Sequence, residues 1–136
     1  NKLNEFKNVA VIAQTTFDEK VFLEYAEYIK GNVDKDVNVM VKNTICNATS
    51  IRQNETREMA KSKDIMIIVG GKNSSNTHKL YNISKEECEN TYWVETKDEL
   101  NFNVLEGKLD VGIMAGASTP KNVIDDVVQA IEEYEG

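Results

Sequence analysis

The sequence predicts an α/β fold in which parallel sheets are flanked by helices on both faces, a doubly wound arrangement of three layers. Short apolar runs alternate with longer amphipathic stretches along the whole chain. One run, residues 65–69 (Ile-Met-Ile-Ile-Val), has five large apolar residues in succession. Such a run is typical of a strand that is buried on both faces of a parallel sheet. The stretches between the runs are long enough for the crossover helices that join parallel strands.

In the first part of the chain, an amphipathic helix separates two predicted strands. Residues 9–13 and 37–41 are short apolar runs and predict strands. Between them, residues 18–30 place apolar side chains at helical spacing, and Gly31 follows as a stop signal. Residues 48–61 predict a second helix with a thin apolar stripe.

The second part of the chain repeats this alternation after the central strand. We predict a helix from about Ser75, a strand over 91–94 nearer the sheet edge, and a last strand over 111–115. Thr119 is predicted to cap the final helix, with Pro120 in its first turn. The apolar face of this helix consists of Val123, Ile124, Val127, Val128 and Ile131.

Length and charge limit the classes of function. A chain of 136 residues can hold one compact domain, or one domain plus part of another. Its net charge of −7 argues against nucleic acid or an anionic membrane as partner, because both need a basic face. We find no apolar run of membrane-spanning length and no signal-peptide pattern, and we expect a cytoplasmic protein. Because the sequence opens on Asn rather than Met, we also expect that an upstream segment has been removed.

The loop after the central strand is the strongest candidate for a ligand site. It reads Gly-Gly-Lys-Asn-Ser-Ser-Asn over residues 70–76. A helix that begins here would offer backbone N–H groups to an anion, and Ser74, Ser75 and Asn76 would add side-chain donors for a phosphate or diphosphate. The alternative is a polar loop in which Ser74 or Ser75 merely caps the next helix.

Three further loops follow strands and should lie at the same sheet edge. They are residues 14–16, 43–49 and 116–120, all rich in hydroxyls and small side chains. Such an edge suits a polyanion that is held by neutral donors. Cys46 precedes a predicted helix, where the helix dipole favours a thiolate. The alternative is that Cys46 is a small buried hydrophobic residue.

Four motifs occur in order along the chain. They are Gln14-Thr15-Thr16, Cys46-x-Ala48-Thr49-x-x-Arg52-Gln53, Val69-Gly70-x-Lys72-Asn73-Ser74-Ser75-Asn76 and Ala115-Gly116-Ala117-Ser118-Thr119-Pro120. Each is weak alone, but in this order and with these separations they are highly specific. From about Val9 onward, the chain resembles the carboxyl-terminal part of the LytB family, the 4-hydroxy-3-methylbut-2-enyl diphosphate reductases.

The resemblance implies a fragment of an enzyme with three similar α/β domains around a central iron–sulfur cluster of the 4Fe-4S type, held by three cysteines. Residues 1–43 would end the central domain, and residues 44–136 would form the carboxyl-terminal domain. Cys46 would be one of the three cluster ligands, and Thr15 would lie close to the substrate. The implied ligands of the substrate diphosphate are Ser74, Ser75, Asn76 and Ser118.

The implied reaction is a two-electron reductive removal of the hydroxyl from an allylic diphosphate, which yields isopentenyl and dimethylallyl diphosphates. Electrons would come from an external donor of the ferredoxin or flavodoxin type. The family's other two cysteine ligands and its proton-donating glutamate belong to an amino-terminal half that this sequence lacks, so we assign no catalytic residue here. One thiolate cannot hold such a cluster, and we expect this chain alone to carry no cluster and no reductase activity.

Two other classes of function are left open by the residues themselves. One is a non-catalytic, flavodoxin-like α/β module that binds a phosphorylated ligand or has a regulatory role. The other is a phosphatase or transferase with Cys46 as the nucleophile. That chemistry needs an anion-binding loop directly after the cysteine with an Arg at close spacing, and residues 47–52 match this pattern only loosely.

Overall fold

The structure, a computed structural model, describes residues 1–107 and 110–134. Every predicted strand and helix is present, with boundaries within two residues of the prediction. In chain order the elements are η1 (Lys2–Glu5), β1 (Asn8–Val11), α1 (Glu19–Gly31), β2 (Asn38–Val41), α2 (Asn47–Ser62), β3 (Ile65–Val69), α3 (Ser75–Glu87), β4 (Thr91–Val94), η2 (Lys97–Glu99), η3 (Phe102–Val104), β5 (Val111–Ala115) and α4 (Lys121–Glu132).

The chain forms two compact units, Asn1–Ser50 and Ile51–Gly136. The division between them falls within α2, so this helix contributes residues to both. The domain assignment from the sequence, 1–43 and 44–136, stays a prediction. Within the described residues, no helix has both the length and the apolar character needed to cross a membrane.

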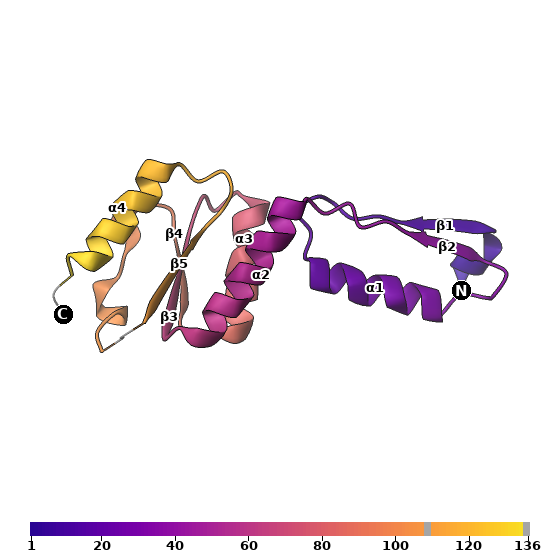
Figure 1. Cartoon of the computed structure of the whole chain (residues 1–136), viewed down its shortest axis with the longest axis horizontal. Helices are drawn as coiled ribbons and strands as arrows, with labels where there is room; N and C mark the ends of the chain where they lie inside the picture. Colours follow the sequence, from indigo (N-terminus) through magenta and orange to yellow (C-terminus); the bar gives the residue numbers. More distant parts are fainter. Residues whose placement is uncertain (108–109, 135–136) are drawn as a thin grey trace. The chain divides into compact units, whose positions relative to one another are not determined.

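The second unit contains a parallel sheet with strand order β4-β3-β5 (Figure 1). Strand β3 lies in the middle, and all five of its residues are buried. The consecutive apolar residues of this strand are explained by its position, because a central strand must bury both faces.

Alternate side chains of β3 pack into two separate apolar layers. Ile65 and Ile67 pack with Val127 of α4, whereas Met66 and Ile68 pack with residues of α2 and α3. Figure 1 shows the corresponding layers, with α4 on one side of the sheet and α2 and α3 on the other. The predicted three-layer α/β arrangement is therefore confirmed for this unit.

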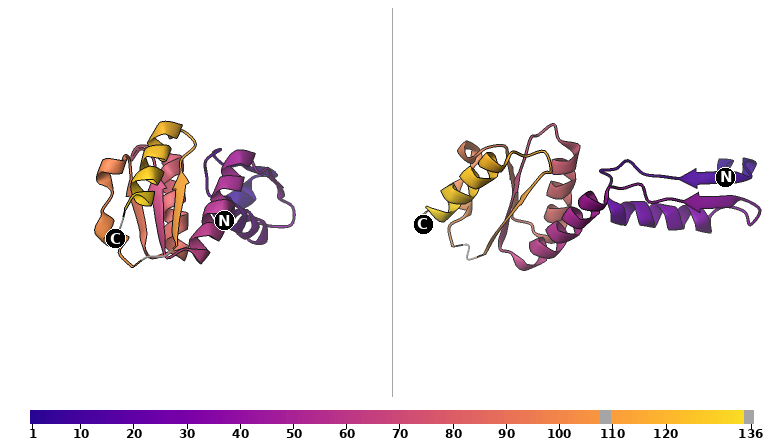
Figure 2. Two further views of the ribbon diagram at one scale, coloured as in Figure 1. Left: turned by 60° about the vertical axis from the view of Figure 1, so that its left-hand side comes forward. Right: turned by 45° about the horizontal axis from the view of Figure 1, so that its top comes forward.

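The first unit consists of a two-stranded parallel sheet and one covering helix. Strands β1 and β2 pair in register from Asn8 opposite Asn38, and α1 runs alongside them (Figure 2). Phe22 and Ala26 are the buried residues of α1. The Asp18 side chain caps this helix by accepting a hydrogen bond from the Val21 N–H at 3.2 Å.

The predicted cap of the last helix is wrong. Pro120 is the N-cap of α4, and α4 has no side-chain cap hydrogen bond. The Thr119 hydroxyl instead donates to the Val69 carbonyl oxygen at 3.1 Å. The neighbouring strand offers a carbonyl at the point where β5 ends, and Thr119 binds that group rather than the amides of its own helix.

Candidate functional site

The loops that follow β3 and β5 leave the sheet side by side. Val69 and Ala115 are paired at the carboxyl ends of these strands. The Gly116 N–H donates to the Val69 carbonyl at 3.1 Å, and the Thr119 hydroxyl donates to the same oxygen. Residues 70–76 and 116–119 therefore lie along one edge of the sheet, which we call the donor rim.

Two glycines allow α3 to approach the donor rim closely. A Cβ added at Gly70 would lie 2.5 Å from the Thr77 hydroxyl oxygen and 3.0 Å from that of Thr119. A Cβ at Gly116 would meet the Thr77 hydroxyl at even closer range. Gly70 also has a φ of +157°, which side-chain-bearing residues rarely adopt. The first turn of α3 is thus packed directly onto the ends of both strands.

The predicted diphosphate ligands occupy the start of α3 and the loop after β5. Ser74 is the N-cap of α3, and its hydroxyl oxygen accepts a hydrogen bond from the Thr77 N–H at 3.2 Å. Ser74 therefore caps the helix, and its role as a diphosphate ligand stays a prediction. Capping does not exclude an anion, because the hydroxyl accepts with its oxygen and still has its own O–H to donate. Ser75 and Ser118 are exposed on the donor rim.

Asn76 carries an unusual feature for a residue at a helix start. Its Oδ1 atom is buried and has no hydrogen-bond partner among residues 1–107 and 110–134. A buried polar atom without a partner costs about 1–3 kcal/mol, and such atoms are rare in folded proteins. Oδ1 is an acceptor and cannot bind an anion, so the group of Asn76 that suits an anionic ligand is its Nδ2 donor.

The electrostatics of the donor rim favour an anion. The first-turn amides of α3 have no partner within the helix, and the helix dipole places partial positive charge at this end. Serine hydroxyls and an asparagine amide surround that point and are uncharged donors. The arrangement can hold a phosphate or diphosphate mainly through directed hydrogen bonds.

In the first unit, Thr15 and Cys46 lie next to each other. The Cys46 N–H donates to the Thr15 carbonyl at 3.0 Å. Thr44 joins the same two loops, since its hydroxyl donates to the Ala13 carbonyl at 2.5 Å and accepts from the Ala13 N–H at 2.8 Å. The loops after β1 and β2 are therefore held side by side.

The Cys46 thiol is exposed, which excludes its alternative role as a buried hydrophobic residue. Its carbonyl accepts the hydrogen bond of the Ser50 N–H, so Cys46 lies at the start of α2. Hydrogen bonds from the backbone N–H groups of Thr49 and then Ala48 lower the pKa of the Cys46 thiol. Cys88, in contrast, is buried, and its thiol contacts the Lys63 carbonyl at 3.7 Å.

A thiolate is the form of cysteine that binds iron. Cys46 therefore fits the chemistry of a single cluster ligand. In the described part of the chain, no group of three or more His, Cys, Asp and Glu side chains could hold a metal ion.

The lowered pKa predicts a reactive thiol. We expect the alkylation rate of Cys46 by iodoacetamide to rise with pH and to reach its midpoint below that of a cysteine in an unstructured peptide. Replacing Thr49 with Val should move this midpoint only slightly, because the Thr49 side chain is the smallest of the causes that lower the pKa. Labelling that remains in a Cys46→Ser variant measures the contribution of buried Cys88. A midpoint at or above the peptide value would contradict the proposed effect of the backbone N–H groups.

The predicted site residues thus form two groups. Thr15 and Cys46 are together in Asn1–Ser50, and Ser74, Ser75, Asn76 and Ser118 are on the donor rim of the second unit. The prediction that both groups line one pocket stays a prediction.

Sequence reasoning missed residues that build the donor rim without facing a ligand. Thr77 is fully buried against Gly70 and Gly116. Trp93, in the adjacent strand, donates its indole N–H to the Gly70 carbonyl at 2.8 Å. The sequence held one signal for the close packing of Thr77. Gly70 and Gly116 lie at the ends of paired strands, and a glycine at such a position indicates that another element approaches closely.

Comparison with known proteins identifies close relatives. The model of the LytB protein family matches residues 1–132. The 4-hydroxy-3-methylbut-2-enyl diphosphate reductase of Nautilia profundicola is 49% identical over 127 residues, which cover 93% of this chain and 45% of the relative. The reductase of Aquifex aeolicus is also 49% identical over 127 residues, covering 93% of this chain and 43% of the relative. The chain thus spans about half the length of the curated relatives it matches.

Solved structures of reductases share the fold. One structure of (E)-4-hydroxy-3-methyl-but-2-enyl diphosphate reductase, the terminal enzyme of the non-mevalonate pathway, matches with a TM-score of 0.66 at 47% identity. The matched region covers 96% of this chain and 45% of the chain in that structure. The structure of the E-1-hydroxy-2-methyl-but-2-enyl-4-diphosphate reductase from Plasmodium falciparum matches with a TM-score of 0.77 at 23% identity. The matched region covers 93% of this chain and 39% of the chain in that structure. At that identity the second likeness concerns the fold alone.

Proposed function

The chain belongs to the LytB family, and we propose that it is the carboxyl-terminal part of a 4-hydroxy-3-methylbut-2-enyl diphosphate reductase that acts in the cytoplasm. The observation that carries the proposal is the donor rim, in which the two family motifs at residues 69–76 and 115–120 lie on paired strands. Two loops far apart in sequence thereby present hydroxyl and amide donors at one helix start.

The whole protein would remove the hydroxyl group of (E)-4-hydroxy-3-methylbut-2-enyl diphosphate. The C–O bond breaks, two electrons and two protons are consumed, and the products are water and isopentenyl or dimethylallyl diphosphate. An external donor of the ferredoxin or flavodoxin type would supply the electrons. The residues of this chain would bind and orient the substrate, while the cofactor carries the redox chemistry.

On the donor rim, Ser75 and Ser118 would donate hydroxyl hydrogen bonds to the diphosphate from two sides. Ser74 would donate its O–H to the ligand while its oxygen keeps capping α3. Asn76 would donate from its Nδ2 group to the diphosphate, because its Oδ1 and the diphosphate oxygens are both acceptors and cannot bind each other. The dipole of α3 would add attraction without a neutralising cation.

Cys46 would be one ligand of a 4Fe-4S cluster. Its exposure and lowered pKa support this role, because a cluster ligand must be a deprotonated thiol. The cluster, when bound, supplies electrons to the substrate. Thr15 would lie near the substrate, since its carbonyl binds the Cys46 N–H. The remaining ligands and the proton donor would come from the amino-terminal half of the protein.

The proposal is tested on a full-length protein that carries this chain, purified without oxygen. With dithionite-reduced methyl viologen as donor, we expect two electrons to be consumed per substrate molecule and both isomeric products to form. A full-length protein that contains its cluster and binds the substrate without converting it would contradict the proposal. That result would instead favour a non-catalytic module that binds a phosphorylated ligand.

The role of the loop after β5 can be tested separately. Removing one hydrogen bond to a charged group costs about 1.5–3 kcal/mol, so Ser118→Ala is expected to raise KM about 10- to 150-fold with kcat nearly unchanged. Ser62→Ala is the matched control, because Ser62 is an exposed serine at the end of α2, away from the donor rim. Its hydroxyl donates to the Met59 carbonyl of its own helix at 3.0 Å. Equal KM values for Ser118→Ala and the control would remove Ser118 from the site.

A further inference from the structure

We propose that Trp93 is a positioning residue for the diphosphate loop, and that Lys72 acts through Trp93 rather than as a ligand of the diphosphate. The inference rests on the proposed function of the donor rim. Trp93 lies in β4, the strand that pairs with β3, and Ile68 is its partner in the register. Its indole N–H donates to the Gly70 carbonyl at 2.8 Å, at the first residue of the loop.

Lys72 is bound to β4 by its side chain and to the residue that follows β4 by its main chain. Its ammonium donates to the Trp93 carbonyl at 2.9 Å and lies 4.7 Å from the centroid of the Trp93 ring. Its backbone N–H donates to the Glu95 carboxylate at 2.5 Å. A cation that binds a carbonyl and an aromatic face is already engaged on β4, so it stabilises the loop there instead of serving as a free charge for an anion.

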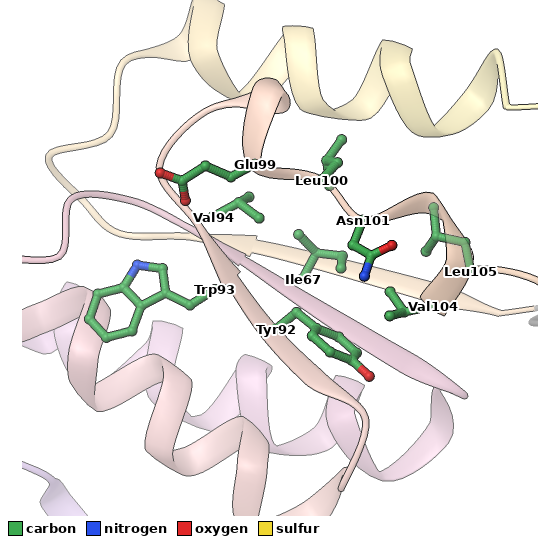
Figure 3. A pocket seen from close by; sticks show the side chains of 9 residues that line it. All are labelled: Ile67, Tyr92, Trp93, Val94, Glu99, Leu100, Asn101, Val104 and Leu105. Atoms are coloured by element: carbon green, nitrogen blue, oxygen red, sulfur yellow. The ribbon is translucent and has the colours of Figure 1, made fainter.

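Trp93 also contacts the helix that follows the loop. Its ring lies 5.6 Å from that of His78 and 5.5 Å from that of Tyr81, both in α3. Figure 3 shows Trp93 at one end of a pocket beside β4, with Val104 and Leu105 at the other. Trp93 therefore contacts the segment that carries Ser74, Ser75 and Asn76 both before it, at Gly70, and after it, on α3.

Holding both ends of this segment orders its donors before a ligand arrives. A ligand that binds a pre-ordered loop does not have to supply the entropy cost of ordering it, and its affinity is higher. The diphosphate is remote from the hydroxyl that leaves, so its binding contributes to ground state and transition state alike. Loss of Trp93 should therefore raise KM and leave kcat nearly unchanged.

The test uses Trp93→Phe in the full-length protein, which keeps an aromatic ring against α3 and removes the indole N–H. Loss of one hydrogen bond of about 1.4 kcal/mol corresponds to a roughly tenfold rise in KM. The matched control is Tyr92→Phe, which removes a polar group from the neighbouring aromatic residue of the same strand and should leave KM within about twofold of the wild type.

A double-mutant cycle separates the two roles of Lys72. The cycle uses Trp93→Leu, because Trp93→Phe keeps the ring face that Lys72 contacts. If Lys72 acts through the Trp93 ring, then Lys72→Met combined with Trp93→Leu raises KM by clearly less than the product of the two single effects, because contacting residues are not additive. If Lys72 binds the diphosphate directly, the two effects multiply, and the inference about Lys72 is wrong. Unchanged KM in Trp93→Phe overturns the inference about Trp93.

Amide hydrogen exchange gives a readout that does not depend on catalysis. In the full-length protein without substrate, Trp93→Phe should speed exchange at residues 71–76 about tenfold, while Tyr92→Phe leaves it unchanged. If the wild-type protein lacks reductase activity but Trp93→Phe still speeds exchange, the proposed function fails and the positioning role of Trp93 stands. Unchanged exchange in Trp93→Phe would overturn the positioning role even in an active enzyme.

Discussion

Replacing Cys46 with serine is expected to abolish reductase activity in a full-length protein that carries this chain. A serine hydroxyl does not ionise near neutral pH, so it cannot replace the thiolate that the start of α2 favours at this position. Loss of a group that merely supports a metal ligand costs about 10- to 100-fold in affinity or activity, and loss of the ligand itself should exceed that range. Iron and acid-labile sulfide per chain, measured under nitrogen, should fall together with kcat.

The control for this experiment is Cys88→Ala. The Cys88 thiol is buried and contacts the carbonyls of Lys63 and Asp64 at 3.7 and 3.8 Å. Its removal should lower the midpoint of thermal unfolding slightly and leave the iron content unchanged. Full iron content in Cys46→Ser would show that Cys46 is not a ligand. A stoichiometric cluster on the 136-residue chain alone would show that the ligand set is smaller than the family resemblance implies.

The strands and helices were predictable because local patterns dictate them. Residues 65–69 have no polar position, and only a central strand buries both of its faces. The position of the donor rim was predictable too, because the carboxyl ends of parallel strands lie at one edge of the sheet. Ser74 and Ser118 could therefore be assigned to neighbouring loops before any coordinates were known.

The contacts that shape the rim could not be predicted, because they depend on which groups meet after folding. Thr119 has the sequence signature of a helix cap, yet its hydroxyl binds the Val69 carbonyl of a neighbouring strand. Trp93 reads as an ordinary strand residue, and its hydrogen bond to Gly70 joins β4 to the loop that follows β3. In both cases the side chain forms a hydrogen bond with a residue that is distant in the sequence.

Gly70 should be the most sensitive position of the donor rim. In Gly70→Ala the new Cβ would lie 2.5 Å from the hydroxyl oxygen and 2.8 Å from the Cγ2 of Thr77, on a backbone with φ of +157°. Thr77 is fully buried and cannot move aside freely. Overpacking and backbone strain each cost about 1–3 kcal/mol, so we expect a loss of about 2–4 kcal/mol in the free energy of unfolding, measured by urea denaturation. Diphosphate affinity should fall as well, because the loop that carries the donors is displaced.

Gly71→Ala is a matched control one residue further along the same loop. The nearest atom to its added Cβ is the Glu95 carboxylate oxygen at 4.0 Å, so we expect a change within about 0.5 kcal/mol. Adding Thr77→Ala to Gly70→Ala removes the two closest atoms and should recover most of the steric part of the loss. The contact with the Thr119 hydroxyl at 3.0 Å and the cost of the backbone conformation remain. If Gly70→Ala and Gly71→Ala unfolded at the same urea concentration, close packing of α3 onto the strand ends would not be what holds the rim in place. If the Thr77→Ala suppressor recovered nothing, the penalty would come from the backbone alone.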